Sequence, residues 1–289
     1  MSSEFQKAKP NVAAKWILAA LLGLAISLRC HSQVPDNVVR RTLLIKVPSP
    51  NGYGTAFTID VDGRQYLITA KHVVTSIDNA MRVGINVQRK SGWFPLQVIV
   101  YKCDDPVDIA VLIPSVQLTV DLPLEPDSSV LAVGQDAYFI GFPYGLRFAP
   151  AGLVGKATVA QLERVGDKKT GRILLDAHTN PGFSGSPLTY RTVGKNGPVF
   201  SVAGVVVAFQ PDESPVLHKK EVRADEVTTE DRARNRLAFD NGKWYRFEDS
   251  GDKVQLNSGI AIAWDIGPAV DLIRRYPLGP KVSGDFRGE

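Results

Sequence analysis

Short apolar runs separated by turn residues recur along most of the chain, a pattern typical of β-strands rather than helices. In the first half these runs predict strands at residues 38–47, 55–61, 65–70, 94–101 and 108–113. The second and third of them flank Asp62-Gly63, a dipeptide that favours a two-residue hairpin turn. Residues 119–129, rich in Pro, Asp and Ser, predict a linker between two halves.

The second half repeats this pattern and ends in a helix. Strands are predicted at residues 137–141, 152–165, 172–177, 199–209 and 259–264. Ile266, Val270 and Ile273 lie at helical spacing and Pro277 follows them, so a helix is predicted at residues 266–276. Many short strands followed by one helix indicate an all-β fold in two barrel-like halves.

Residues 210–257 interrupt the alternation with many charges of both signs and little periodicity. Within them Asn241-Gly242 separates two aromatic-rich arms, so a local hairpin is predicted at residues 237–247. We interpret the whole stretch as an insertion between the last two strands. It is either a lid beside a functional site or a solvated surface loop, and the sequence leaves both interpretations open.

The first 32 residues differ from the rest and predict a targeting segment. Lys7, Lys9 and Lys15 precede an uninterrupted apolar run at residues 16–28. A helix over that run spans roughly 20 Å, whereas the hydrocarbon core of a membrane is about 30 Å thick. This favours a signal peptide; the alternative is an uncleaved anchor that holds the chain in a membrane through residues 16–28. In both cases we expect an exported domain, periplasmic, secreted or membrane-anchored.

Composition adds few constraints. Lys and Arg number 34 and Asp and Glu number 30, so the charge balance gives no indication of nucleic-acid binding. The two cysteines, Cys30 and Cys103, provide no disulfide framework, and we expect Cys103 to be a buried thiol. Nothing in the composition predicts an oligomeric state.

Three segments carry candidate catalytic chemistry. His72 lies in LITAKHVV, Asp108 opens DIAVLI, and Ser184 lies between glycines in NPGFSGSPL. A serine hydroxyl needs a base to take its proton, histidine can serve as that base, and a carboxylate fixes the tautomer of the ring. Each segment alone is a weak signal. Together, in the order His, Asp, Ser and each beside an apolar strand, they predict a catalytic triad.

The glycines around Ser184 have a second consequence. They allow the backbone to turn tightly, because glycine adopts conformations that other residues avoid. The N–H groups of Gly182 and Ser184 are then predicted to point at one developing oxyanion.

These segments resemble the trypsin-like (chymotrypsin-fold) serine peptidases. TAKHVV is similar to their Thr-Ala-x-His segment, DIAVL to the strand opened by the triad aspartate, and GFSGSP to the nucleophile loop. Three further segments resemble the HtrA/Deg branch of these peptidases. They are GFPYGL at residues 141–146, NPGFSGSPL and GIAIAWDIGPAVDLI. The resemblance covers roughly residues 38–276, except the insertion. It implies two six-stranded antiparallel β-barrels with a C-terminal helix, a triad in the cleft between the barrels, and hydrolysis of protein or peptide substrates without metal or cofactor.

The resemblance also sets the expected domain organisation. The N-terminal barrel is expected at about residues 38–118, the C-terminal barrel at about 130–276, and a tail at 277–289. Phe183 and Ser186 depart from the HtrA pattern, but neither position supplies a triad side chain. No PDZ domain follows in this sequence, so PDZ-based substrate capture and cage assembly are not carried over.

Specificity is the least defined part of the site. The resemblance implies that His178, six residues before Ser184, lies at the base of the S1 pocket, with Val207 and Phe209 in one wall. His178 would then favour an acidic or polar P1 side chain, or it is merely packed and selects nothing. Phe209 would instead narrow the pocket to small side chains.

Two classes of function follow from these residues. The leading hypothesis is an exported serine endopeptidase that forms an acyl-enzyme. The alternative is a catalytically silent trypsin-like domain that binds peptides or a partner. An esterase of the α/β-hydrolase kind is excluded, because its nucleophile precedes the histidine and its parallel strands alternate with helices.

Overall fold

The computed structural model describes residues 34–49, 52–120, 122–145, 152–163, 171–194, 197–234 and 236–283. All the elements below belong to the unit Asp36–Glu289. The targeting segment predicted at residues 1–32 lies outside the described residues. Within the ranges given above, no helix is long and apolar enough to cross a membrane.

The first six strands form a closed antiparallel barrel in the order β1-β2-β3-β6-β5-β4. They are β1 (Thr42–Lys46), β2 (Tyr53–Val61), β3 (Arg64–Ala70), β4 (Met81–Arg89), β5 (Gly92–Lys102) and β6 (Ile109–Pro114). Leu67, Ile85 and Leu112 are among the apolar side chains that fill its core. Asp62 and Gly63, with φ of 49° and 71°, form the predicted turn between β2 and β3.

Six later strands close a second ring, β14-β10-β9-β8-β11-β12, because β14 also pairs with β12. They are β8 (Asp136–Gly141), β9 (Leu153–Leu162), β10 (Arg172–Asp176), β11 (Ser186–Gly194), β12 (Gly197–Val222) and β14 (Lys243–Asp265). The short β7 (Glu125–Pro126) adds to β12 in parallel, and η2 (Pro143–Gly145) follows β8. The helix α4 (Gly267–Arg275) follows β14. Two antiparallel barrels and a C-terminal helix confirm the predicted fold class.

The start of the first predicted strand is wrong. Residues 38–41 belong to a helix, α2 (Asp36–Arg41), and the strand begins only at Thr42. Val38 and Arg41 are both fully buried, and their spacing of three residues places them on one helix face. Strands β4 and β11 were not predicted.

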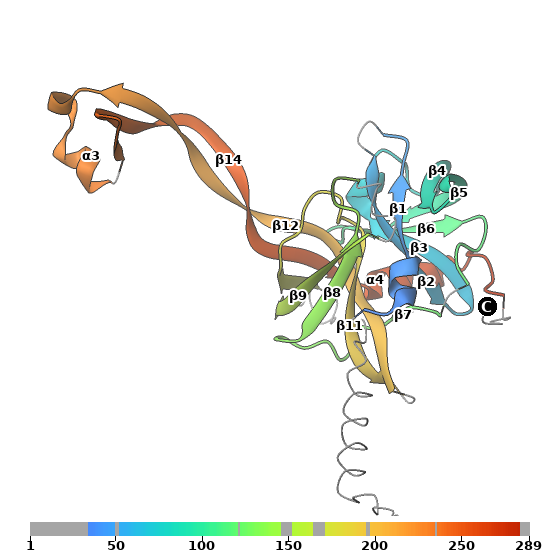
Figure 1. The fold of residues 1–289 in the computed structure, drawn as a ribbon. Helices are drawn as coiled ribbons and strands as arrows, with labels where there is room; N and C mark the ends of the chain where they lie inside the picture. Colours follow the sequence, from blue (N-terminus) through green and yellow to red (C-terminus); the bar gives the residue numbers. More distant parts are fainter. Residues whose placement is uncertain are drawn as a thin grey trace, which may run out of the picture. The chain divides into compact units, whose positions relative to one another are not determined.

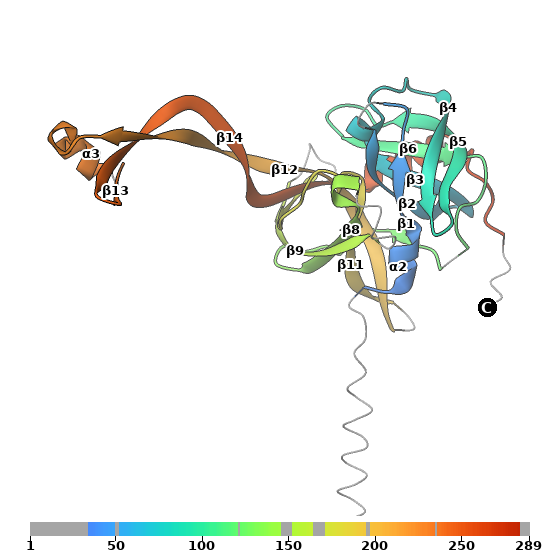
Figure 2. The same ribbon diagram turned by 45° about the horizontal axis from the view of Figure 1, so that its top comes forward.

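Residues 210–257 consist of the outer parts of two long strands and the short elements that join them. The pairing of β12 with β14 continues from Pro211 and Asn257 as far as Val222 and Trp244. These outer parts form a twisted two-stranded β-ribbon with α3 at its end (Figure 1, Figure 2). The end consists of η3 (Ala224–Glu226), α3 (Thr229–Ala233) and β13 (Leu237–Asp240).

Two smaller predictions are confirmed within these elements. Asn241 and Gly242, with φ of 49° and 78°, turn the chain from β13 into β14, as the predicted hairpin requires. Cys103 is a free, buried cysteine, and burial raises the pKa of its thiol to about 12. A thiol with so high a pKa is a packing group rather than a nucleophile at neutral pH.

Candidate active site

Strand pairing places His72 beside Asp108. Strands β3 and β6 run antiparallel, and Ala70 at the end of β3 lies opposite Ile109 at the start of β6. The 3-10 helix η1 (Lys71–Val74) follows β3 at once and carries His72, while Asp108 immediately precedes β6. The register of these two strands therefore brings together residues that are 36 positions apart.

The Asp108 carboxylate holds His72 at two points. Its Oδ2 lies 2.7 Å from His72 Nδ1, and its Oδ1 accepts the main-chain N–H of His72 at 2.9 Å. The two side chains are 47% and 26% exposed, so the ring is held at the edge of the barrel with one side open to solvent. A proton held at Nδ1 by the carboxylate leaves Nε2 as the basic nitrogen.

A second ion pair fixes the turn that precedes Asp108. Lys71 Nζ lies 2.7 Å from Asp105 Oδ1 and donates a further hydrogen bond to the carbonyl of Cys103 at 3.1 Å. The Lys71 hydrogen bond lowers the pKa of the Asp105 carboxyl, which favours its ionised form. Among the described residues, no group of three His, Cys, Asp or Glu side chains is placed to hold a metal ion.

Ser184 lies in the tight turn between β10 and β11. The carbonyl of Ser184 accepts the N–H of Thr55 at 3.0 Å, and the N–H of Gly185 donates to Val206 at 2.8 Å. Gly185 has a φ of +90°, and a Cβ added to it would collide with the carbonyl oxygen of Thr55. Only glycine fits here, because the turn needs both the left-handed conformation and the empty space.

The Ser184 hydroxyl forms its hydrogen bond away from His72. It donates instead to the main-chain carbonyl of Val207 at 3.1 Å. No hydrogen bond joins Ser184 to His72 in the described part of the chain. The structure therefore brings His72 and Asp108, two of the three predicted triad side chains, into direct contact, whereas the Ser184 hydroxyl is hydrogen-bonded to the main chain.

The two main-chain amides that are predicted to bind an oxyanion are available to donate hydrogen bonds to a ligand. Over the ranges that the structure describes, the N–H groups of Gly182 and Ser184 donate to no acceptor within the chain. Gly182 has a φ of +103°, and a Cβ added there would collide with the main chain at Phe142 and Tyr144. Phe183, between them, packs edge-on against Phe139 at 5.0 Å and keeps its side chain out of the turn.

Thr55 holds this turn in place, a role that no local sequence pattern indicates. Its hydroxyl donates to the carbonyl of Gly182 at 2.7 Å and accepts the N–H of Phe142 at 3.0 Å. Its own N–H binds Ser184, so one fully buried residue of the first barrel contacts three points of the second. We interpret Thr55 as a positioning residue for the two amides that are predicted to bind an oxyanion.

Replacing Thr55 with valine tests this interpretation. Thr55→Val keeps the volume but leaves the Gly182 carbonyl and the Phe142 N–H without their partner. We expect kcat to fall about 10²-fold with little change in KM, because the oxyanion amides lose their alignment. Thr58→Val is the matched control, since Thr58 is buried on the same strand and its hydroxyl has no hydrogen-bond partner. Equal effects of the two substitutions on kcat would contradict a specific role for Thr55.

A pocket of about 270 Å³ opens beside Ser184. Val207 and Phe209, both predicted for it, are in its wall, whereas His178 is not. Its lining has no ionisable side chain and consists of Thr179, Asn180, Pro181, Phe183, Ser184, Val206, Val207, Ala208 and Phe209. The side chains of Ala177 and Thr179 are buried, so the alternation of an extended chain turns His178 outward, where it is exposed beside Gly259.

A family model described as a trypsin-like peptidase domain matches residues 54–209, a range that contains His72, Asp108 and Ser184. A search of the curated proteins found no match.

Solved structures of low sequence identity are also similar to this chain. The inactive form of the Rv3671c protease is 17% identical with a TM-score of 0.46, over 94% of this chain and 98% of that chain. An inactive mutant of Rv3671c from M. tuberculosis H37Rv has the same identity of 17% and TM-score of 0.46, over 84% and 89% of the two chains. The HtrA-type protease AlgW with a tripeptide is 20% identical with a TM-score of 0.48, over 83% of this chain and 62% of that one.

Proposed function

Because this chain belongs to the trypsin-like peptidases, which are serine proteases, we propose that it cleaves peptide bonds with Ser184, His72 and Asp108 as its triad. The observation that carries the proposal is the double contact of Asp108 with His72, through Nδ1 and the main-chain N–H. A contact of that kind fixes both the orientation of the ring and its tautomer, which a general base needs.

Formation of the acyl-enzyme proceeds through two proton transfers at His72. The Ser184 hydroxyl leaves the Val207 carbonyl, rotates toward His72 Nε2 and gives up its proton as Oγ attacks the substrate carbonyl carbon. The amides of Gly182 and Ser184 bind the oxyanion that forms. His72 then passes the proton to the leaving amine, the C–N bond breaks, and an ester on Ser184 remains. Water hydrolyses this ester by the same steps in reverse.

The pocket beside Ser184 sets the preference for the P1 side chain. Its lining offers no charge to pair with, and burying an unpaired charge there is costly. We therefore expect a peptide library to be cleaved after uncharged residues. His178→Ala should leave this profile unchanged, because His178 is outside the lining. A preference for acidic P1 residues that disappears in His178→Ala would contradict this view of the pocket.

Labelling with a serine-reactive fluorophosphonate tests the proposed function. We expect the wild-type chain to be labelled and Ser184→Ala to remain unlabelled, because the reagent reacts only with a serine activated by a neighbouring base. Unlabelled wild-type protein over a range of conditions would overturn the proposal. That result would favour the alternative function, a catalytically silent domain that binds peptides, in which the Ser184 hydroxyl keeps its hydrogen bond to the Val207 carbonyl.

A further inference from the structure

A larger pocket, of about 750 Å³, opens where the first barrel is least tightly closed. Strands β1 and β4 pair only through Ile45 with Val87 and Lys46 with Asn86, and the two strands then separate. The pocket lies at this separation, and a volume of this size is typical of small-molecule sites. Its lining consists of Val39, Arg40, Thr42, Leu43, Gln88, Arg89, Lys90, Ser91, Gln117, Leu118, Thr119, Val120 and Phe142.

The charged side chains in this lining are all positively charged. Arg40, Arg89 and Lys90 are cationic, and no acidic residue is among the lining residues. Arg89 is half-buried and donates to the carbonyl of Leu118 at 2.8 Å, yet neither it nor Lys90 has an acidic partner within the described ranges. Burial without a counter-ion lowers the pKa of the Arg89 guanidinium. An anion bound here would supply the missing charge.

Three of the five neutral polar side chains of the lining already donate hydrogen bonds within the chain. Thr42 donates to the carbonyl of Val38 at 2.9 Å, and the amide groups of Gln88 and Gln117 donate to neighbouring carbonyls at 3.1 and 2.9 Å. The remaining lining is largely apolar and is formed by Val39, Leu43, Leu118, Val120 and Phe142. A ligand rich in polar groups, such as a peptide backbone, would find few partners there.

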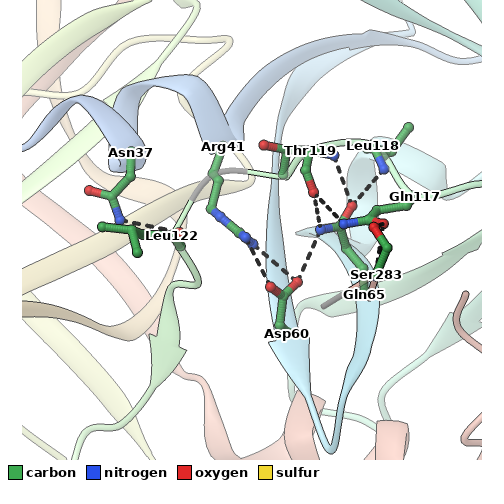
Figure 3. Close-up of polar contacts among 9 residues, drawn as sticks. All are labelled: Asn37, Arg41, Asp60, Gln65, Gln117, Leu118, Thr119, Leu122 and Ser283. Atoms are coloured by element: carbon green, nitrogen blue, oxygen red, sulfur yellow. Dashed lines mark hydrogen bonds and ion pairs between the residues drawn. The ribbon is translucent and has the colours of Figure 1, made fainter. Parts of the chain in front are cut away.

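A buried polar network holds two walls of the pocket in place (Figure 3). Arg41 of α2 binds both carboxylate oxygens of Asp60, at 3.1 and 2.9 Å. Gln65 donates to the same carboxylate at 3.0 Å and to the carbonyl of Thr119 at 2.9 Å, and its oxygen accepts the N–H of Leu118 at 2.6 Å. The wall from α2 and the wall at residues 117–120 are thus fixed to one carboxylate, so the pocket is formed before any ligand binds.

We propose that this pocket binds a single-chain amphiphile with one anionic head, of the chemical class of a fatty-acid carboxylate. The carboxylate lies against Arg89 and Lys90, where it forms charge-assisted hydrogen bonds. The aliphatic chain packs against the apolar side chains of α2, β1 and residues 118–120. The site is separate from the pocket beside Ser184, with which it shares no lining residue.

Isothermal titration of the full chain carrying Ser184→Ala, with dodecanoate below its micelle concentration, tests the proposal. We expect saturable binding of one dodecanoate per chain. We expect no binding of acetate, which lacks the chain, and none of dodecyltrimethylammonium, which has the opposite charge. Because the measurement needs no catalysis, its outcome is independent of the fluorophosphonate result.

Charge reversal at the rim makes the test specific. Lys90→Glu should weaken dodecanoate binding about tenfold or more, the size of one charge-assisted contact. Arg82→Glu is the matched control, because Arg82 is exposed on β4 outside the lining. The proposal is overturned if dodecanoate does not bind, if dodecyltrimethylammonium binds equally well, or if both charge reversals have the same effect. Displacement of dodecanoate by an acidic apolar peptide that binds more tightly would overturn it in favour of a peptide site.

Discussion

Asp108→Asn is expected to lower kcat/KM by about 10⁴-fold, with the fold intact. The aspartate uses both oxygens on His72, one on the ring and one on the main-chain N–H. An asparagine supplies only one acceptor together with an NH₂ donor. If its oxygen keeps the main-chain contact, its NH₂ faces Nδ1, and the ring takes the tautomer in which Nε2 carries the proton. Nε2 then cannot act as a base toward Ser184.

The comparison that isolates this effect is Asp104→Asn. Asp104 is an exposed carboxylate four positions before Asp108, and its substitution removes the same charge from the same loop. We expect it to change kcat/KM by no more than about twofold, because exposed charges contribute little. Peptidase kinetics of the two variants, at matched folded concentration, measure the difference. Retention of activity within tenfold of wild type in Asp108→Asn would contradict the role assigned to Asp108.

Ser184→Ala is expected to lower kcat by about 10⁶-fold, the scale seen when the nucleophile of a triad is removed. The substitution keeps Cβ and removes one hydroxyl, whose one hydrogen bond within the described residues is to the Val207 carbonyl. Stability should therefore change little, and the loss is chemical.

Ser186→Ala serves as the control for the loss of Ser184. Ser186 lies two positions further on, and its buried hydroxyl has no hydrogen-bond partner. Removing it leaves no group unpaired, so we expect near wild-type kcat. Equal loss of activity in the two alanine variants would mean that the loop, and not the Ser184 hydroxyl, had been damaged.

The fold was predictable where strands alternate apolar and polar residues over a buried face. Strand β3 was predictable for another reason, because it is a short apolar run whose last six residues are all buried, and Asp62-Gly63 marks the turn before it. Strand β4 was missed because only Ile85 and Val87 of its residues are buried, which is too weak a pattern. The outer parts of β12 and β14 were not predicted as strands, because a two-stranded ribbon exposed on both faces produces no hydrophobic alternation.

The site was predictable to the extent that it depends on local sequence. His72, Asp108 and Ser184 stand in short motifs, and strand pairing then brings the first two together. The contacts of Thr55 with Gly182 and Phe142 join residues 127 and 87 positions apart, and no local pattern encodes them. His178 lies in an extended segment, where successive side chains point to opposite faces. A shift of one residue would turn His178 from the exposed face to the buried one, so its exposure could not be predicted from the sequence.

Intact-mass spectrometry of the acyl-enzyme tests the central claim most directly. The wild-type chain is mixed with an activated ester of a short peptide that ends in an uncharged residue, and the reaction is stopped with acid within the first turnover. We expect a mass increase of one acyl group per chain, which peptide mapping locates on Ser184 and which Ser184→Ala lacks. Release of product without an adduct, or an adduct on another residue, would contradict catalysis by Ser184 through an acyl-enzyme.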